Sequence, residues 1–491
     1  MSLKEQVSYG IKWTSASMVL VRALRFLTTV VLARLLVPEM FGLIALANVA
    51  IDTMALARQI GLGPAYIYKT FSSPAERKRA EKTIFLTTLA MNGALFTICF
   101  TSAPAIAQFF NNAMLTDVLK VMAFSFPVGT LQTVPNVIML KKMQFGKTAA
   151  SELVSACTYS LVGITLAFMG FGIWSLVAAQ LISRFVSGIV FMVLARWVPR
   201  FGFELSIARE LFSYGKFIWA FTVLSAVGGA LDRVFVGKLW GSASLGYYHI
   251  AFNMCQLSGL LFATLMEKVT FPAYSTLKNE PGRLRNAVTN TMSSVSIIVV
   301  PLAFGLIVLS ERIIGSIFGE KWLPAAPLVD VLAFHGLIHA LAPISSSVLK
   351  ATGRPNVLMN LGIAHHVLKF ALLFLLRPLG TVGIALAVVL SMGLSTATGF
   401  GIVVRCVPIS VSQLLKPFLG TVPPAAVMFI VLKLMQESFA DGEKVTSWPV
   451  LGGLVVLGVV LYSVATFLFN RNNFMVFRRL LVDVAVSKGG Q

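Results

Sequence analysis

The sequence is short of charged residues, and of acidic ones above all. Only 12% of its 491 residues are charged, with 19 acidic against 40 basic side chains, while 57% are hydrophobic. Soluble globular domains typically carry about 25% charged residues. The composition therefore excludes an ordinary soluble protein and predicts a polytopic membrane protein.

Cysteine is also scarce, and the four cysteines lie in or at the ends of apolar stretches, with no C-x-x-C pair and no histidine at ligand spacing. This pattern predicts neither a disulfide framework nor a metal site. The sequence also has no P-loop and no nucleotide-sugar, metal or nucleophile motif. We therefore expect no cofactor, no catalytic residue and no ATP-driven pumping. The first residues, MSLKEQVSYGIKW, lack the pattern of a cleaved secretory signal, so the first span is expected to be retained.

What the sequence does contain is a succession of apolar segments. A hydrocarbon core about 30 Å thick is crossed by roughly 20 apolar residues in a helix. Division of the chain at its polar, glycine and proline breaks gives about fourteen such segments, so we predict an all-α integral membrane fold with about fourteen transmembrane helices.

The basic residues support this count. With the N-terminus inside, the segments predicted to face the cytoplasm hold most of them, whereas the outside loops hold only Lys238, Lys321, Arg377 and Lys444. That bias is the one expected of cytoplasmic loops. Both termini should then be cytoplasmic, and the net charge of +21 reflects topology rather than a nucleic-acid site.

The chain also carries a weak internal repeat. The stretch VVLARLLVPEMFGLIALA from Val30 aligns with VFVGKLWGSASLGYYHIA from Val234, which matches Gly42 with Gly246. Six predicted spans separate the copies, an even number, so both should have the same orientation. We expect an N-terminal six-helix bundle (1–205) and a C-terminal one (206–405), related by an axis along the membrane normal. Two additional helices and a basic cytoplasmic tail follow (406–491).

Several charged residues lie inside the predicted spans, although an arginine near the bilayer centre costs about 2.5–3.5 kcal/mol on insertion scales. Arg22 and Arg25 follow the spacing of one face of the first span, and Asp52 lies on a polar stripe of the second. The cations expected near mid-depth are Arg22, Arg25, Arg58 and Arg184 from the first half, with Arg233 and Lys369 from the second.

Two interpretations of these charges stay open. Interhelical pairs such as Arg58 with Asp52, or Arg233 with Asp232, would explain one or two of them. The cations outnumber the two deep carboxylates, so the set as a whole favours a cationic, water-filled cavity for an anionic substrate. Arginine suits phosphate because its planar fork of donors can form two parallel hydrogen bonds.

Some stretches resemble a known family. ALANVA after LARLLVPEMFG, FGEKWLPAAPLV at 318–329 and ATGRPNVLMN at 351–360, together with the predicted organisation, resemble the Wzx-type polysaccharide flippases. The resemblance is to the branch that includes the colanic-acid and teichuronic-acid exporters, within the multidrug/oligosaccharidyl-lipid/polysaccharide exporter superfamily.

This resemblance implies a function. The protein would flip oligosaccharide repeat units linked to undecaprenyl diphosphate from the cytoplasmic to the outer leaflet of the bacterial inner membrane, by alternating access. The product would serve O-antigen, capsule or exopolysaccharide synthesis. In the related lipid II flippase, arginines of the first two helices line a cationic cavity, and Arg22, Arg25 and Arg58 stand in comparable places here.

The membrane potential is one energy source for this transport. The inside-negative membrane potential favours outward movement of negative charge by about 2.3 kcal/mol per charge per 100 mV. Asp52 or Asp232 could hold a coupling proton or Na⁺. The expected partners are the lipid-linked oligosaccharide and the bilayer, and contacts with the polysaccharide polymerase and chain-length proteins are left open.

Two alternatives belong to other classes. An integral-membrane polymerase or acyltransferase of the same pathway needs a reactive constellation, usually on a sizeable loop, and no predicted outside loop exceeds about a dozen residues. A multidrug cation antiporter of the same superfamily predicts an acidic cavity, whereas the deep charges here are mainly basic.

Overall fold

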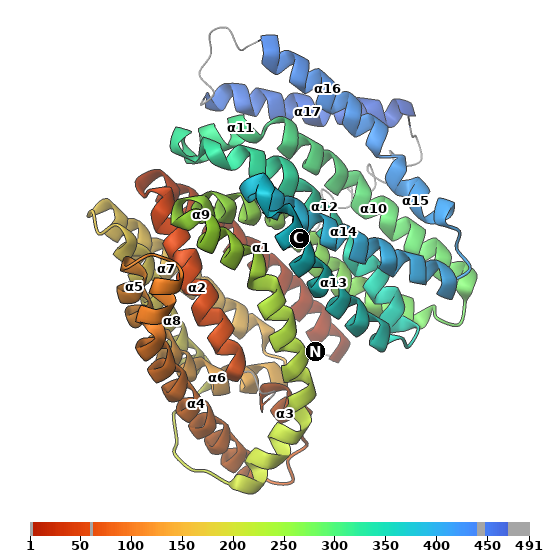
Figure 1. Ribbon diagram of the computed structural model, residues 1–491. Helices are drawn as coiled ribbons and strands as arrows, with labels where there is room; N and C mark the ends of the chain where they lie inside the picture. Colours follow the sequence, from red (N-terminus) through yellow and green to blue (C-terminus); the bar gives the residue numbers. More distant parts are fainter. Residues whose placement is uncertain (1–2, 59–61, 439–446, 470–491) are drawn as a thin grey trace. The chain divides into compact units, whose positions relative to one another are not determined.

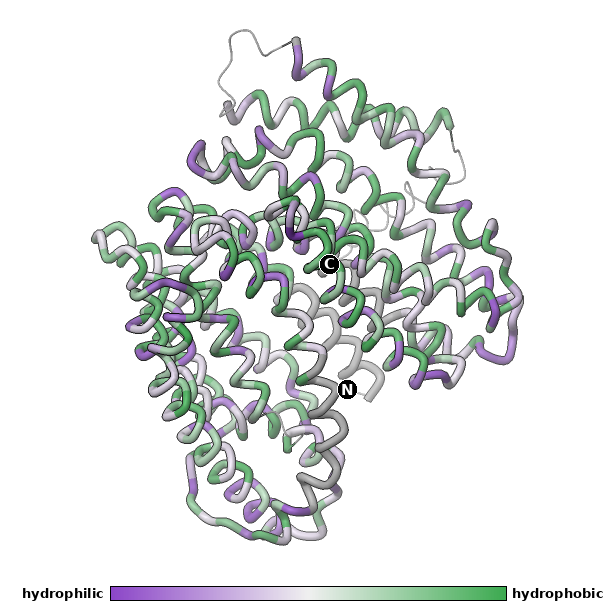
Figure 2. The backbone as a smooth tube through the Cα atoms, in the orientation of Figure 1, coloured by the Kyte–Doolittle hydropathy of each residue, from purple (hydrophilic) through white to green (hydrophobic). Residues whose placement is uncertain are grey.

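The described part of this membrane protein is all-helical. The computed structural model describes residues 3–58, 62–438 and 447–469, and this part of the chain contains helices and no strand. Nine helical segments within it are long and apolar enough to cross a membrane. Figure 2 shows hydrophobic residues along the long helices and hydrophilic residues concentrated near their ends and connections. The residues group into two compact units, Met1–Gly246 and Tyr247–Gln491 (Figure 1).

The first unit is built from long helices joined by short turns. Its elements are α1 (Leu3–Leu35), α2 (Pro38–Ala55), the 3₁₀ turn η1 (Leu56–Arg58), α3 (Leu62–Tyr68), α4 (Pro74–Phe109), α5 (Met114–Met122), α6 (Ser125–Lys141), α7 (Phe145–Phe168), α8 (Ile173–Ala195) and the first part of α9 (Leu205–Thr276). The long helix α9 is interrupted at Gly241, whose φ of 79° and ψ of −176° are not helical.

The second unit continues from α9. Its elements are α10 (Pro281–Val308), α11 (Ser310–Ile313), η2 (Ile314–Phe318), η3 (Glu320–Ala325), α12 (Ala326–Ala351), α13 (Pro355–Leu376), η4 (Arg377–Leu379), α14 (Gly380–Cys406), α15 (Val411–Leu419), α16 (Val422–Ser438) and α17 (Trp448–Phe469). The predicted tail beyond α17 and Lys444 lie outside the described residues.

Local sequence explains where several helices begin. Proline occupies the first turn of α2, α4, α10 and α13, where its missing N–H costs no helical hydrogen bond. At α4 the Ser73 hydroxyl also accepts a hydrogen bond from the Glu76 backbone N–H at 3.1 Å. These signals set helix ends without reference to distant parts of the chain.

In the first unit, α2 crosses α9 at a pair of glycines. A methyl group added at Gly42 would overlap the carbonyl oxygen of Ser242, and one added at Gly246 would overlap the carbonyl oxygen of Pro38. Small residues allow helix backbones to approach closely in membranes, where packing rather than hydrophobicity drives helix association. The glycines matched in the repeat therefore lie at one helix crossing.

Hydrogen bonds between side chains fix other helix pairs. Asn92 on α4 donates to the Thr130 hydroxyl on α6 at 2.8 Å, and both side chains are buried. In the second unit, Thr270 on α9 donates to Ser347 on α12, also at 2.8 Å. Such bonds restrict how each helix is rotated about its axis, and this rotation decides which of its residues face a cavity.

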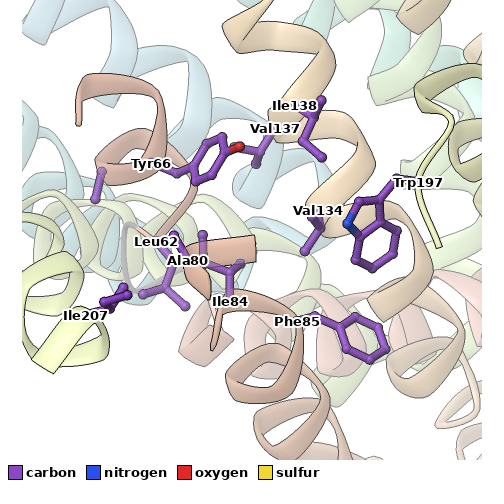
Figure 3. Packing of buried hydrophobic residues seen from close by; sticks show 11 residues of the cluster. Leu62, Tyr66, Ala80, Ile84, Phe85, Val134, Val137, Ile138, Trp197 and Ile207 are labelled. Carbon is purple, nitrogen blue, oxygen red and sulfur yellow. The ribbon is translucent and has the colours of Figure 1, made fainter. Parts of the chain in front are cut away.

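An apolar cluster joins helix ends within the first unit (Figure 3). Tyr66 of α3 and Trp197, which follows α8, lie on opposite sides of the α6 residues Val134, Val137 and Ile138. Phe85 of α4 contacts Trp197 edge to face, with ring centroids 5.5 Å apart. The start of α4 and the ends of α6 and α8 are thereby held together.

Candidate functional site: a cationic cavity in the first unit

A polar cavity of about 360 Å³ lies within the first unit, among α1, α2, α7 and α8. Each helix contributes two residues four positions apart: Arg25 and Thr29, Asn48 and Asp52, Ser155 and Tyr159, and Gln180 and Arg184, with Ser183 beside the last pair. Residues four apart lie on one helical face. Four helices thus turn a polar stripe toward a common space.

Two guanidinium groups and one carboxylate set the electrostatics of this cavity. Arg184 is attracted by the carboxylate of Asp52 and repelled by the guanidinium of Arg25. The phenol of Tyr159 also interacts electrostatically with Arg25. The described lining therefore carries more positive than negative charge, and it adds hydroxyl and amide groups that can donate hydrogen bonds to an anion.

The backbone around Arg184 is held by a neighbouring helix. The Gln132 amide on α6 donates to the Arg184 carbonyl oxygen at 2.8 Å. On α8 itself, the Ser183 hydroxyl donates to the Gln180 carbonyl oxygen at 3.1 Å, and the Gln180 Oε1 atom is buried with no hydrogen-bond partner in the described part of the chain. The Gln180 amide therefore retains an unused acceptor beside the cavity.

The structure brings together three of the residues predicted from sequence, Arg25, Asp52 and Arg184, and places others elsewhere. Arg22 does not line this cavity; its side chain is half-buried, and Nη1 is buried with no hydrogen-bond partner among the described residues. Arg58 ends η1, and its side chain lies outside the described part.

The remaining predicted residues are not among those that line this cavity. Arg233 on α9 donates from Nη2 to the Gly229 carbonyl oxygen at 3.3 Å, and the neighbouring Asp232 is almost fully buried. Lys369 belongs to the second unit, where it is buried on α13. Neither Arg233 nor Asp232 contributes to the cavity lining.

Sequence reasoning missed four of the nine lining residues. Ser155 and Tyr159 on α7, and Gln180 and Ser183 on α8, were not singled out because they carry no charge. Their signal is present in the sequence as polar residues at helical spacing within otherwise apolar segments. That signal is weak, because serine and tyrosine are also common where membrane helices pack.

The second unit contains a groove of different chemistry. It has a volume of about 320 Å³ and is lined almost entirely by apolar side chains of α10, α16 and α17. Gln436 at the far end of α16 donates to the Val308 carbonyl oxygen of α10 at 2.8 Å, which ties these helices together. Such a lining suits hydrocarbon and offers no counter-charge for an anion.

The fold and the cavity define the class of the protein. Several apolar helices mark a multi-pass membrane protein. The charged polar cavity lies among four helices, of which α7 and α8 are long and apolar enough to cross a membrane, and intramembrane ionisable residues mark substrate pathways in transporters. Residues 31–327 match the model of a family described as "Polysaccharide biosynthesis protein". The chain belongs to this family.

Individual relatives agree with this membership. The chain is 24% identical over 359 residues to the teichuronic acid biosynthesis protein TuaB of Bacillus subtilis, covering 72% of this chain and 73% of TuaB. It is also 24% identical over 481 residues to the succinoglycan biosynthesis transport protein ExoT of Rhizobium meliloti, covering 97% of this chain and 95% of ExoT. The resemblance seen in the sequence motifs is therefore confirmed.

Among solved structures, the chain has the fold of the lipid II flippase MurJ in its inward closed conformation. The TM-score is 0.76 with 16% sequence identity, over 94% of this chain and 99% of MurJ. At this identity the likeness is one of fold.

Proposed function

We propose that this protein is a flippase that moves oligosaccharides linked to undecaprenyl diphosphate across the bacterial inner membrane, from the cytoplasmic to the outer leaflet. The observation that carries this proposal is the cavity in which Arg25 and Arg184 face a space lined by neutral hydrogen-bond donors. Two guanidinium groups that face one cavity favour a diphosphate, because charge-assisted hydrogen bonds are the strong ones. Membership of the polysaccharide biosynthesis family supports a glycan as cargo.

Transport is proposed to proceed by alternating access, for O-antigen, capsule or exopolysaccharide synthesis. The repeat and the alternation of basic residues support about fourteen spans in two six-helix bundles (1–205 and 206–405), followed by two further helices and a basic tail (406–491), with both termini cytoplasmic. An inside-negative potential would assist the outward step of an anionic headgroup.

Within this scheme Arg25 and Arg184 bind the diphosphate directly. Arg22 is a further proposed contact, supported by its place one turn before Arg25 and by its buried, unpartnered Nη1. Positive charge is the only support for three further proposed diphosphate contacts, Arg58, Arg233 and Lys369. A multidrug cation antiporter is disfavoured, because the cavity lining carries two arginines against one carboxylate.

The test is a leaflet-exposure assay on proteoliposomes of the full chain. Lipid-linked oligosaccharide from the source cells is labelled on its sugar with a nitrobenzoxadiazole fluorophore, and membrane-impermeant dithionite is added outside. We expect all of the fluorescence to be quenched with the protein, and only the outer-leaflet fraction in empty liposomes. The matched control carries the same labelled sugar on a polyprenol without diphosphate, and it should stay in its leaflet. Equal movement of both lipids would contradict diphosphate recognition, and no movement of either would contradict flipping.

A second prediction concerns the coupling ion. Asp52 lies in the cavity with both arginines, so we propose it as the carboxylate that carries a proton or Na⁺ during the return step. The Asp52→Asn variant is expected to flip lipid at a rate that no longer changes when a pH or Na⁺ gradient is imposed. It should also bind the diphosphate more tightly, because a like charge has been removed. The measurement is the initial rate in the same assay with and without each gradient.

Asp232→Asn provides the comparison, since Asp232 lies outside the cavity and is the other predicted ion carrier. If Asp232→Asn loses the response to the gradient and Asp52→Asn keeps it, then Asp232 is the carboxylate that carries the coupling ion. A native response in both variants would show that neither carboxylate couples transport to an ion.

A further inference from the structure

A second polar cavity, of about 190 Å³, lies at one end of the first unit. It is formed where α4 begins and where α6 and α8 end. Its charged lining comprises Arg77, Lys141, Lys142 and Arg196 against the single carboxylate of Glu81. It shares no residue with the cavity around Arg25 and Arg184.

The one carboxylate is already engaged. Glu81 Oε1 lies 3.5 Å from Arg77 Nε and accepts a hydrogen bond of 2.9 Å from the Tyr66 hydroxyl. Burial, and then the Glu81 charge, raise the pKa of Tyr66, so its hydroxyl stays protonated and remains the donor. Glu81 can therefore offset the charge of one cation among the four.

Lys141 has a local structural role that Lys142 and Arg196 lack. Its ammonium donates to the carbonyl oxygen of Tyr66 at 2.8 Å and to that of Lys69, which holds the end of α3. Lys142 and Arg196 are exposed and have no ion-pair partner in the described part of the chain. They provide two unengaged cations at the mouth of the cavity.

Stabilisation of helix ends does not account for this cluster. A cation near a helix C-terminus gains about 0.3–1 kcal/mol from the helix dipole. Arg196, however, caps α8 in the left-handed conformation, with φ 52° and ψ 46°, where glycine is the usual residue. A glycine at position 196 would end the helix without strain. The four cations around one carboxylate also repel one another, and a bound anion would relieve this repulsion.

The floor of the cavity is rigid. Tyr66, Ile138 and Trp197 belong both to the cavity lining and to the apolar cluster of Figure 3, where each is almost fully buried. Packing of these residues fixes the helix ends that carry the cations, so the backbone of the site does not have to be ordered when a ligand arrives.

We propose that this cavity binds a phosphate group, either the headgroup phosphate of an anionic phospholipid or free phosphate. Arg196 supplies a planar fork of donors that matches phosphate oxygens, and Lys142 supplies a point charge. The volume is smaller than the roughly 300–1,000 Å³ of pockets for drug-sized ligands, which suits a headgroup. The helix ends that form it carry the basic segments predicted to be cytoplasmic, and basic pockets between spans on that side attract anionic lipid.

The first test measures phosphatidylglycerol bound to the full chain in detergent by native mass spectrometry, with phosphatidylcholine as the zwitterionic reference. The variant Lys142→Gln with Arg196→Gln should bind phosphatidylglycerol about tenfold more weakly, since two charge-assisted contacts are lost at exposed positions, where solvent screens them. The control variant Lys78→Gln with Arg200→Gln removes the same charge from exposed positions outside the cavity and should bind as the native protein does.

The second test needs no variant, so it does not depend on how well a variant folds. Acylation of the Lys142 amine in the native protein is followed by peptide mass spectrometry, with Lys78 as the internal reference. Slower acylation of Lys142 with phosphatidylglycerol alone assigns the cavity to a lipid headgroup, and slowing by inorganic phosphate as well shows that free phosphate also occupies it. The proposal is overturned if neither probe protects Lys142, or if the cavity variant binds phosphatidylglycerol as well as the control variant does.

Discussion

Replacement of Arg25 and Arg184 together by glutamine is expected to abolish flipping of the lipid-linked oligosaccharide. Hydrogen bonds to charged groups contribute about 1.5–3 kcal/mol each. Loss of one such contact from each arginine should therefore weaken diphosphate binding by roughly 10²–10⁴-fold. Flipping is measured by the leaflet-exposure assay, and binding by displacement of the labelled lipid.

A stability measurement separates this effect from misfolding. An arginine inside a membrane costs about 2.5–3.5 kcal/mol on insertion scales, so its removal should leave insertion intact. Loss of transport in a variant that is inserted and unfolds close to the native temperature is therefore the expected combination. The variant Lys78→Gln with Arg200→Gln, which changes two exposed cations, should retain transport.

A conservative pair sharpens the assignment. Arg25→Lys with Arg184→Lys keeps both charges and loses both planar forks, so partial activity is expected if the arginines hold the diphosphate through paired hydrogen bonds. Native flipping by the glutamine variant would show that these residues do not bind the substrate. The cavity would then have to be assigned another role.

Substitution of Gly42 is expected to have the largest effect on stability. A methyl group at this position overlaps the backbone carbonyl of Ser242, so α2 and α9 cannot keep their crossing. Backbone cannot move aside as a flexible side chain can, and we expect Gly42→Ala to cost about 3 kcal/mol or more. Gly42→Leu should prevent accumulation of folded protein.

The measurement is the thermal unfolding midpoint in detergent together with the monodisperse fraction on size-exclusion chromatography. Gly93→Ala on α4 is the matched control, because a methyl group there meets nothing within 4 Å. That substitution should be neutral or slightly stabilising, since alanine is a better helix former than glycine. A Gly42→Ala protein with the midpoint of Gly93→Ala would mean that the two helices do not depend on this contact.

Features that act locally could be predicted from the sequence. Apolar runs predict the helical membrane class because a hydrocarbon core accepts only backbone whose hydrogen bonds are satisfied internally. Prolines such as Pro38 and Pro74 mark helix starts for reasons that lie within one turn. The motifs at 318–329 and 351–360 predicted a resemblance that the family match and the relatives confirm.

The candidate site was only partly predictable. Arg25, Asp52 and Arg184 stood out because charge is costly in a membrane, whereas Ser155, Tyr159 and Gln180 carry no such cost and blend with packing residues. Arg22, on the same predicted helical face as Arg25, does not line the cavity. Helical spacing shows which residues of one helix share a face. It does not show which neighbouring helix or cavity that face contacts.

The sequence by itself therefore determined that the protein lies in a membrane, that it is helical, and which family it belongs to. Hydropathy, helix-end signals and motifs all depend on residues close together in the chain. Only the tertiary structure decided which polar groups meet. Contacts such as Gly42 with Ser242, and Asn92 with Thr130, constrain how the helices pack and rotate. Packing of four helices collects one polar pair from each into a cavity, and the meeting of three helix ends places Lys142 and Arg196 at the mouth of another.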